Sequence, residues 1–208
     1  MQITKCFCLF SMSILISSYM PFPSIAWCSA MLKADTIILD EMESYRKMTF
    51  RNKYEIATAN GRLKLSIPLL NGRNQRVPMA EVQIFKEEDW QQQHYKSIKN
   101  AYNRSPFFEY YELELHRLLA APYNRLIDFN KASLDFVLHS LRIKKEIQLL
   151  GDNTIDDNND LVDWRKEQQG AFEQKPYYQL FESKNGFLSN LSVLDLIFNE
   201  GNQAINFL

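Results

Sequence analysis

The sequence predicts an α/β fold in which an N-terminal βαβ unit and a β-hairpin form a mixed sheet, packed by a helical segment and a C-terminal helix. Two observations indicate this class. Residues 14–39 hold two short apolar runs separated by a helical segment, the spacing of a parallel βαβ unit. Residues 47–69 alternate between polar and apolar side chains on both sides of Asn60-Gly61, a dipeptide that favours a hairpin turn.

The βαβ unit is expected to begin with a buried strand at Ile14–Ser17. Pro23-Ser24 is typical of a helix start, so we expect a short helix at Ile25–Lys33 and then a second strand at Thr36–Leu39. In open α/β sheets the ligand crevice lies beyond the carboxyl ends of the strands. The loops that follow both strands should therefore face this crevice, and the start of the helix would favour an anion there.

The hairpin is expected to have one apolar face and one cationic face. The cations either keep an exposed strand face hydrated or bind a phosphate or carboxylate group, because Arg offers a planar fork of donors and Lys a point charge. Asp40 and Glu41, which follow the preceding strand, are either partners of these cations or catalytic groups. The apolar face holds Met48, Phe50, Tyr54, Ile56, Leu63, Leu65, Ile67 and Leu69 with Asn52 among them, and the opposite face of the entry strand holds Lys47, Arg51 and Lys53.

A helical segment is expected after the hairpin and one more strand, Ala80–Phe85. Asp89 should cap a first helix, residues 107–118 a second one, and residues 126–141 a third. The acidic, Asn-rich residues 151–160 are expected to be a solvated linker. Ser192 should cap a final helix that ends near Gly201 and packs on the sheet.

Two polar side chains lie on otherwise apolar helical stripes. His94 follows Trp90 by four residues and precedes Ile98 by four, and Asn130 lies between Ile127 and Leu134 on its own stripe. Each is either a hydrogen-bonded core group or part of a pocket between the helices and the sheet.

Composition excludes several classes of protein. The formal net charge of −1 over 208 residues lacks the basic excess of a nucleic-acid binder. The six glycines form neither of the two common phosphate-binding loops. Residues 156–167 match acidic positions of a calcium-binding loop, but Leu161 stands where that loop needs glycine, so we expect no metal site. Three cysteines near the N-terminus fit free thiols better than a disulfide framework.

The N-terminus allows two interpretations. Residues 5–26 resemble a signal peptide with a cleavage site after Ala26, or else Ile14–Ser17 is the first strand of the fold. In the second case Met12 could be the true start, residues 1–12 a non-native or disordered extension, and residues 13–208 a single domain. The apolar stretch is too short and too interrupted to span a bilayer.

Motifs along almost the whole chain from Ile14 resemble the WbqC-like protein family, in the form found among Bacteroidetes. Other members carry His-Gln-Pro after the first strand, where this chain has Ser17-Ser18-Tyr19, so any role of that histidine is lost or moved. The matching motifs are the 19–27 loop, YRKMTFRNKYEI, Trp90 with His94, Tyr102, SPFF at 105–108, Asp128-Phe129-Asn130, Asp163-Trp164-Arg165, YYQLF at 177–181 and GFLSNLSVLDLIFNEG at 186–201.

The resemblance implies a role in surface-polysaccharide or O-antigen biosynthesis, with transfer of an aminoacyl or acyl group to an amino sugar as the suspected activity. It also implies that residues before Ala26 belong to the fold, which favours a cytoplasmic protein. The expected substrate is a nucleotide sugar or an acyl donor, without a cofactor, a nucleic-acid partner or a membrane span. A non-catalytic binding or assembly protein for polysaccharide enzymes is the alternative.

We assign site residues on this basis. Glu41 or His94 is the candidate general base, because burial can tune the pKa of either group towards neutrality. Lys47 and Arg51 are the candidate ligands for phosphate or carboxylate. The full set of expected substrate-binding residues is Tyr19, Tyr45, Lys47, Arg51, Asn52, Tyr102 and Asn130.

Overall fold

The computed structural model describes residues 13–72, 74–151, 160–166 and 172–208, so the expected extension at residues 1–12 and most of the acidic linker lie outside it. The predicted βαβ unit is confirmed. Strand β1 (Ser13–Ser17) and strand β2 (Thr36–Leu39) pair in parallel, and helix α1 (Ile25–Lys33) connects them. Both faces of β1 and β2 are buried, which explains why these strands read as continuous apolar runs.

Two further strands complete the parallel sheet. β5 (Ile147–Leu149) pairs with β2, and β6 (Asp160–Asp163) pairs with β1, so the strand order is β5-β2-β1-β6. The sequence analysis did not predict either strand. Both are short edge strands with charged or polar residues among the apolar ones, and neither shows a clear period of two.

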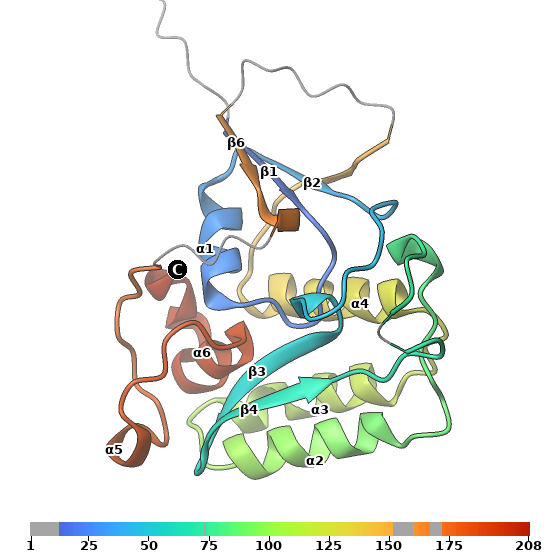
Figure 1. Cartoon of the computed structure of the whole chain (residues 1–208). Coiled ribbons are helices and arrows are strands. Elements are labelled where there is room, and N and C mark those ends of the chain that lie inside the picture. The colour runs from blue at the N-terminus through green and yellow to red at the C-terminus, as the bar shows by residue number, and fades with distance from the viewer. Residues whose placement is uncertain (1–12, 73, 152–159, 167–171) are drawn as a thin grey trace, which may run out of the picture.

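The hairpin is a separate two-stranded sheet and does not join the parallel one. β3 (Lys53–Thr58) and β4 (Gly61–Ser66) pair in antiparallel register, with Gly61 at φ +93° after the turn. The α/β class is confirmed, but the expected single mixed sheet is not formed. β3 contacts helices α2 and α6, so helices rather than sheet neighbours cover it (Figure 1).

The predicted entry strand begins later than its alternation indicated. Met48 has a positive φ of 62° and is 77% exposed, and the Thr49 hydroxyl donates to the Arg46 carbonyl oxygen at 2.7 Å. A short 3-10 helix, Phe50–Asn52, follows. The chain therefore turns instead of extending, so Arg51 does not lie on an exposed strand face but is buried.

The three central helices are confirmed as α2 (Trp90–Tyr102), α3 (Phe108–Ala120) and α4 (Leu126–Ser140). Asp89 precedes α2, but its side chain makes no capping hydrogen bond. The expected strand at residues 80–85 is wrong: the chain forms a 3-10 helix at Met79–Glu81 and then only isolated bridges. These residues pack beside α4, where tertiary contacts replace a regular ladder.

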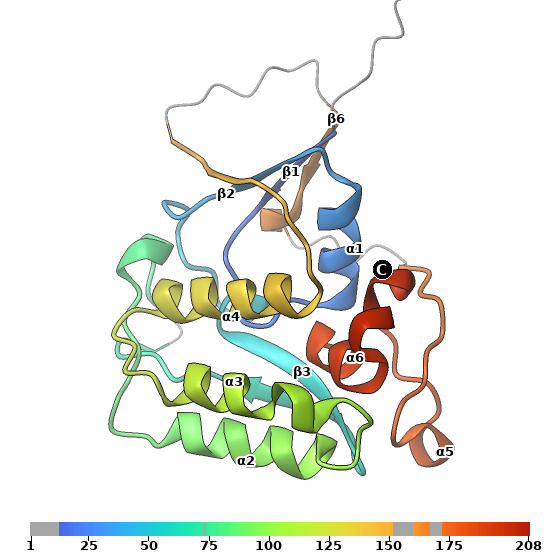
Figure 2. The ribbon, with the colours of Figure 1, turned by 180° about the vertical axis from the view of Figure 1, so that it is seen from behind.

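The C-terminal segment packs against the core, as predicted. A short helix α5 (Glu182–Asn185) precedes α6 (Val193–Glu200), whose Ser192 cap accepts a hydrogen bond from the Leu194 amide at 3.3 Å. α6 contacts α1, α3, α4 and β3, and a 3-10 helix, Gly201–Phe207, follows it. In both views the parallel sheet lies at one end of the molecule, α2 and α3 at the other, with α1 and α6 along one side (Figures 1 and 2).

Candidate functional site

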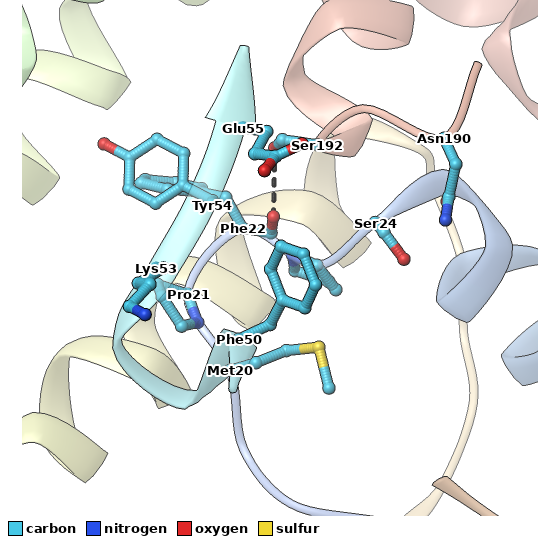
Figure 3. Close-up of a pocket in the computed structure, with 11 residues that line it drawn as sticks. Met20, Pro21, Phe22, Ser24, Phe50, Lys53, Tyr54, Glu55, Asn190 and Ser192 are labelled. Atoms are coloured by element: carbon cyan, nitrogen blue, oxygen red, sulfur yellow. Dashed lines mark hydrogen bonds between the residues drawn. The ribbon is translucent and has the colours of Figure 1, made fainter. Parts of the chain in front are cut away.

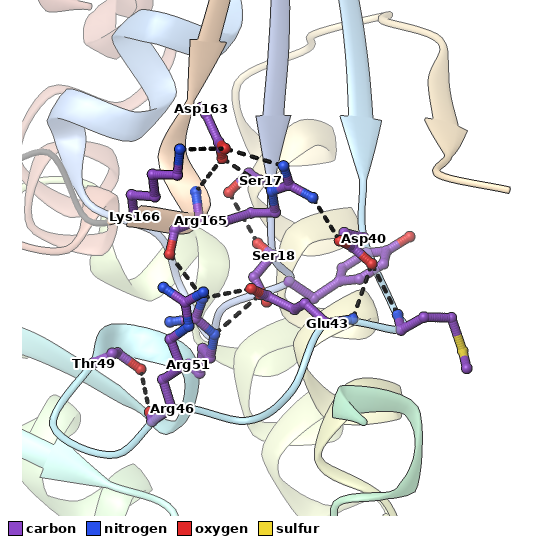
Figure 4. A network of polar contacts seen from close by, with 12 residues as sticks. Ser17, Ser18, Asp40, Glu43, Arg46, Thr49, Arg51, Asp163, Arg165 and Lys166 are labelled. Carbon is purple, nitrogen blue, oxygen red and sulfur yellow. Dashed lines mark hydrogen bonds and ion pairs between the residues drawn. The ribbon is translucent and has the colours of Figure 1, made fainter. Parts of the chain in front are cut away.

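The order of the parallel strands locates a crevice. The chain passes from β1 to β2 and then to β5 in one direction, and returns to place β6 on the other side of β1. Such a reversal leaves a crevice beyond the carboxyl ends of the two neighbouring strands at which the direction changes, here β1 and β6. Three polar segments meet there: residues 17–19 after β1, residues 40–43 after β2, and residues 163–166 at the end of β6 (Figure 4).

Arg165 joins the ends of β6 and β2. Its Nε and Nη2 atoms donate to the two carboxylate oxygens of Asp163, both at 3.0 Å, and its Nη1 atom donates to Asp40 Oδ2 at 2.8 Å. The other oxygen of Asp40 accepts the amides of Met42 and Glu43. Hydrogen bonds from Arg165 hold the pKa of Asp163 below its usual value. Asp163 is therefore held as a carboxylate, and hydrogen bonds fix both acidic side chains in position.

Arg51 and Glu43 form a second, more deeply buried ion pair. Arg51 Nε donates to Glu43 Oε1 at 3.0 Å, and Arg51 Nη2 donates to Glu43 Oε2 at 2.7 Å and to the Arg165 carbonyl oxygen at 3.0 Å. This bidentate pairing already neutralises the guanidinium charge. An anion would have to compete with Glu43, which lowers the value of Arg51 as a phosphate ligand. That role stays a prediction.

Two of the predicted site residues, Glu41 and Tyr19, interact with Lys131. Lys131 Nζ lies 2.5 Å from Glu41 Oε1 and 5.3 Å from the centre of the Tyr19 ring. The neighbouring Asn130 is fully buried, and its Nδ2 atom donates to the backbone oxygens of Tyr19 at 3.2 Å and Arg51 at 2.9 Å. Burial and the charge of Glu41 raise the pKa of Tyr19 to about 12. Tyr19 thus stays a neutral phenol at physiological pH.

A small hollow lies among the residues that follow β1 and β6 and the 3-10 helix at Phe50–Asn52. We call it the switch-point hollow; its cavity volume is about 40 Å³. The Ser18 hydroxyl on its wall is buried and has no hydrogen-bond partner among the described residues. A second hollow adjoins it and shares Met20, Ser24 and Phe50 with it. The hydrogen bond from the Ser192 hydroxyl to the Phe22 oxygen lies in its wall (Figure 3). The switch-point hollow is lined by Ser18, Met20, Ser24, Phe50, Arg51 and Trp164.

The start of α1 is not the free anion site that the sequence suggested. The Ile25 amide donates to the Leu191 oxygen at 3.0 Å, and the Ala26 amide donates to Asn190 Oδ1 at 3.0 Å. The Trp27 amide donates to the Ser24 hydroxyl. All three amides therefore already have partners from the C-terminal segment or the helix cap.

The structure places His94 away from this cluster. It lies between α2 and the hairpin, where Nδ1 is 2.9 Å from the Tyr54 hydroxyl and Nε2 is 3.3 Å from the Ser66 oxygen. Burial lowers the pKa of His94 to about 4. Both ring nitrogens have a partner, and the ring lines neither of the two hollows at the site. These surroundings favour a structural role, and its catalytic role stays a prediction.

The other predicted binding residues also have protein partners. The Tyr102 hydroxyl donates to buried Asp195 at 2.7 Å and accepts the Ala57 amide. The Tyr45 hydroxyl donates to Asn52 Oδ1 at 3.1 Å. Lys47 is exposed and donates to Asn74 at 3.3 Å. None of these contacts reaches the switch-point hollow.

Several residues of the site were absent from the sequence-based assignment, among them Ser18, Glu43, Asp163, Trp164 and Arg165. Asp163-Trp164-Arg165 was identified only as a matching motif, because β6 had not been recognised and the segment could not be placed at a strand end. Ser18 directly follows the first strand, and this position is the signal that could have identified it. Within the described ranges, no group of three or more His, Cys, Asp or Glu residues could hold a metal ion. No helix found there is both long and apolar enough to cross a bilayer.

Fold and site together define an α/β protein with a polar cluster and a small hollow at the carboxyl ends of its parallel strands. The WbqC-like protein family matches residues 17–179, and the chain belongs to this family. The matched range includes every residue that lines the switch-point hollow, but it ends before the motif at residues 186–201. No curated protein and no solved structure matches the chain.

Proposed function

We propose that the chain is a transferase of surface-polysaccharide biosynthesis, which moves an acyl or aminoacyl group onto an amino sugar. The observation that carries the proposal is the switch-point hollow, where an unpaired buried hydroxyl lies at the carboxyl ends of parallel strands, in the region that also holds the Arg165–Asp40 ion pair. Enzymes of this architecture place their substrates there. Membership of the WbqC-like family supports the link to polysaccharides.

Glu41 is the proposed general base. In the transfer, the amino nitrogen of the sugar attacks the acyl carbon, the bond to the leaving group breaks, and the nitrogen loses a proton that a carboxylate accepts. The Glu41 side chain is 22% exposed, so it remains accessible from solvent while Lys131 holds it. Tyr19, Arg51 and Asn130, which the Asn130 side chain links through the backbone oxygens of the other two, are the proposed substrate-binding residues.

The proposed compartment is the cytoplasm, where nucleotide sugars and acyl donors are available. Cleavage after Ala26 would remove β1 and the first two residues of α1, which are buried in the core. Recovery of a folded mature form that begins at Trp27 would contradict this assignment.

Turnover tests the proposal. Purified protein would be incubated with nucleotide-activated amino sugars and a panel of acyl and aminoacyl donors, and products would be detected by the mass gained on the sugar. Glu41→Gln should reduce the rate by about 10²–10⁴-fold, the usual contribution of general base catalysis. The exposed Glu88→Gln is the matched control and should keep full activity. Binding of a nucleotide sugar without consumption of any donor would favour the binding or assembly role.

A further inference from the structure

Two residues that line the switch-point hollow carry unused hydrogen-bond donors. Arg51 makes three side-chain hydrogen bonds, all through Nε and Nη2, and its Nη1 atom has no partner in the part of the chain that the structure describes. The Ser18 hydroxyl is likewise unpaired, and Ser18 is only 3% exposed. A buried hydroxyl without a partner costs free energy, so its presence at a cavity wall points to a ligand atom that pairs with it.

The remaining lining of the hollow is largely apolar. Met20, Phe50 and Trp164 contribute side chains of low polarity. The volume of about 40 Å³ holds roughly three water-sized groups, at about 10–15 Å³ for each. A ligand that satisfies both donors within this space needs an acceptor oxygen and one or two carbon atoms. The remainder of such a ligand would extend out of the hollow.

The surrounding charges favour a neutral acceptor over an anion. Arg51 is paired with Glu43, and Arg165 is shared between Asp40 and Asp163. Lys166 lies 3.9 Å from Asp163, so these six side chains carry three negative and three positive charges, and the cluster has no positive excess to attract a carboxylate or phosphate. An anion in the hollow would also lie near carboxylates in a poorly hydrated region, where like charges repel strongly. A carbonyl oxygen avoids that repulsion.

We propose that the switch-point hollow binds a short neutral acyl group, with its carbonyl oxygen accepting from Ser18 and Arg51 and its alkyl carbon against Met20, Phe50 and Trp164. This inference rests on the proposed function and deepens it, because it makes the hollow the binding site of the transferred acyl group. It also gives the unpaired Ser18 hydroxyl a hydrogen-bond partner.

Acetamide and acetate are matched probes, since they have nearly the same shape and differ in charge. The protein would be labelled with 5-fluorotryptophan, and the fluorine resonance of Trp164 would be identified by Trp164→Phe. Acetamide should shift this resonance saturably, while those of the buried Trp27 and Trp90 stay in place. Acetate should bind at least about tenfold more weakly, which corresponds to roughly 1.4 kcal/mol.

Ser18→Ala should weaken acetamide binding by about five- to tenfold, the usual effect of losing one hydrogen bond to a neutral group. The variant should fold at least as well as the parent, because it removes an unpaired buried hydroxyl. Exposed Ser183→Ala is the control and should bind normally. Absence of a saturable acetamide shift, equal binding of acetate, or unchanged binding by Ser18→Ala would each overturn the inference. These results do not depend on turnover, so the acyl site and the transferase activity fail separately.

Discussion

The ion pair between Arg51 and Glu43 allows a sharp test of how the site is held together. The side chains are 4% and 8% exposed, and the guanidinium also donates to the backbone oxygen that follows β6. Arg51→Ala would leave the Glu43 carboxylate buried without a counter-charge and would remove three hydrogen bonds. Breaking one partner of a buried pair costs about 3–5 kcal/mol. The sequence alone predicted a change within about 0.5 kcal/mol, because it placed Arg51 on an exposed strand face.

Thermal and urea unfolding would measure this loss. At about 2–4 °C for each kcal/mol in a chain of this size, Arg51→Ala should lower the Tm by roughly 6–20 °C. Lys47→Ala is the matched control: Lys47 is an exposed cation in the same loop, and its removal should change the free energy of unfolding by less than about 0.5 kcal/mol. Glu43→Ala and the variant that carries both changes complete a double-mutant cycle. The double variant should lose clearly less free energy of unfolding than the two single variants lose together.

Two outcomes would refute the reasoning. If Arg51→Ala and Lys47→Ala lowered the stability equally, the burial of Arg51 would contribute nothing. If the two single losses simply added in the double variant, Arg51 and Glu43 would act independently and the pair would not organise the strand ends. Both results are read from the same unfolding curves.

Three further predictions concern the core. Burial lowers the pKa of His94 to about 4. As the pH falls below about 6.5, the histidine therefore takes up a proton in the unfolded chain before it does so in the folded protein. The free energy of unfolding should decrease by at most about 3 kcal/mol between neutral pH and pH 4. His94→Gln should lower the free energy of unfolding by about 1–3 kcal/mol at neutral pH. Urea titrations at several pH values should show a weaker pH dependence for the variant than for the parent. An equal pH dependence in both proteins would contradict this prediction. Tyr102→Phe should cost about 1–3 kcal/mol in chemical unfolding, because a buried carboxylate loses a donor and a backbone amide loses its acceptor. Gly201→Ala should lower the Tm more than Gly186→Ala. Both glycines have a positive φ, but only at Gly201 would the added Cβ lie 2.6 Å from the Phe107 ring. Equal losses of Tm would show that the Phe107 ring moves aside.

Local patterns in the sequence determined the elements whose signals are local. The βαβ unit, the hairpin turn, α2 to α4 and the capped α6 follow from apolar periodicity and from residues such as Ser24 and Ser192 that pair with amides a few positions along the chain. The position of Tyr19 and Glu41 beyond the strand ends followed from the same reasoning. Period-two alternation failed at residues 48–52, because a positive φ and a 3-10 helix redirect the chain there.

Tertiary structure alone decided the composition of the site. β6 pairs with β1 across more than a hundred residues, and this pairing brings Arg165 to Asp40 and to the Arg51–Glu43 pair. No local pattern encodes such a contact, because edge strands are short and their charged residues look like those of a loop. The same long-range packing buried Arg51, enclosed His94 between Tyr54 and Ser66, and used the amides of α1 for the C-terminal segment. Long-range packing thus determined which polar groups pair with one another inside the protein. It left the Ser18 hydroxyl unpaired at the switch-point hollow.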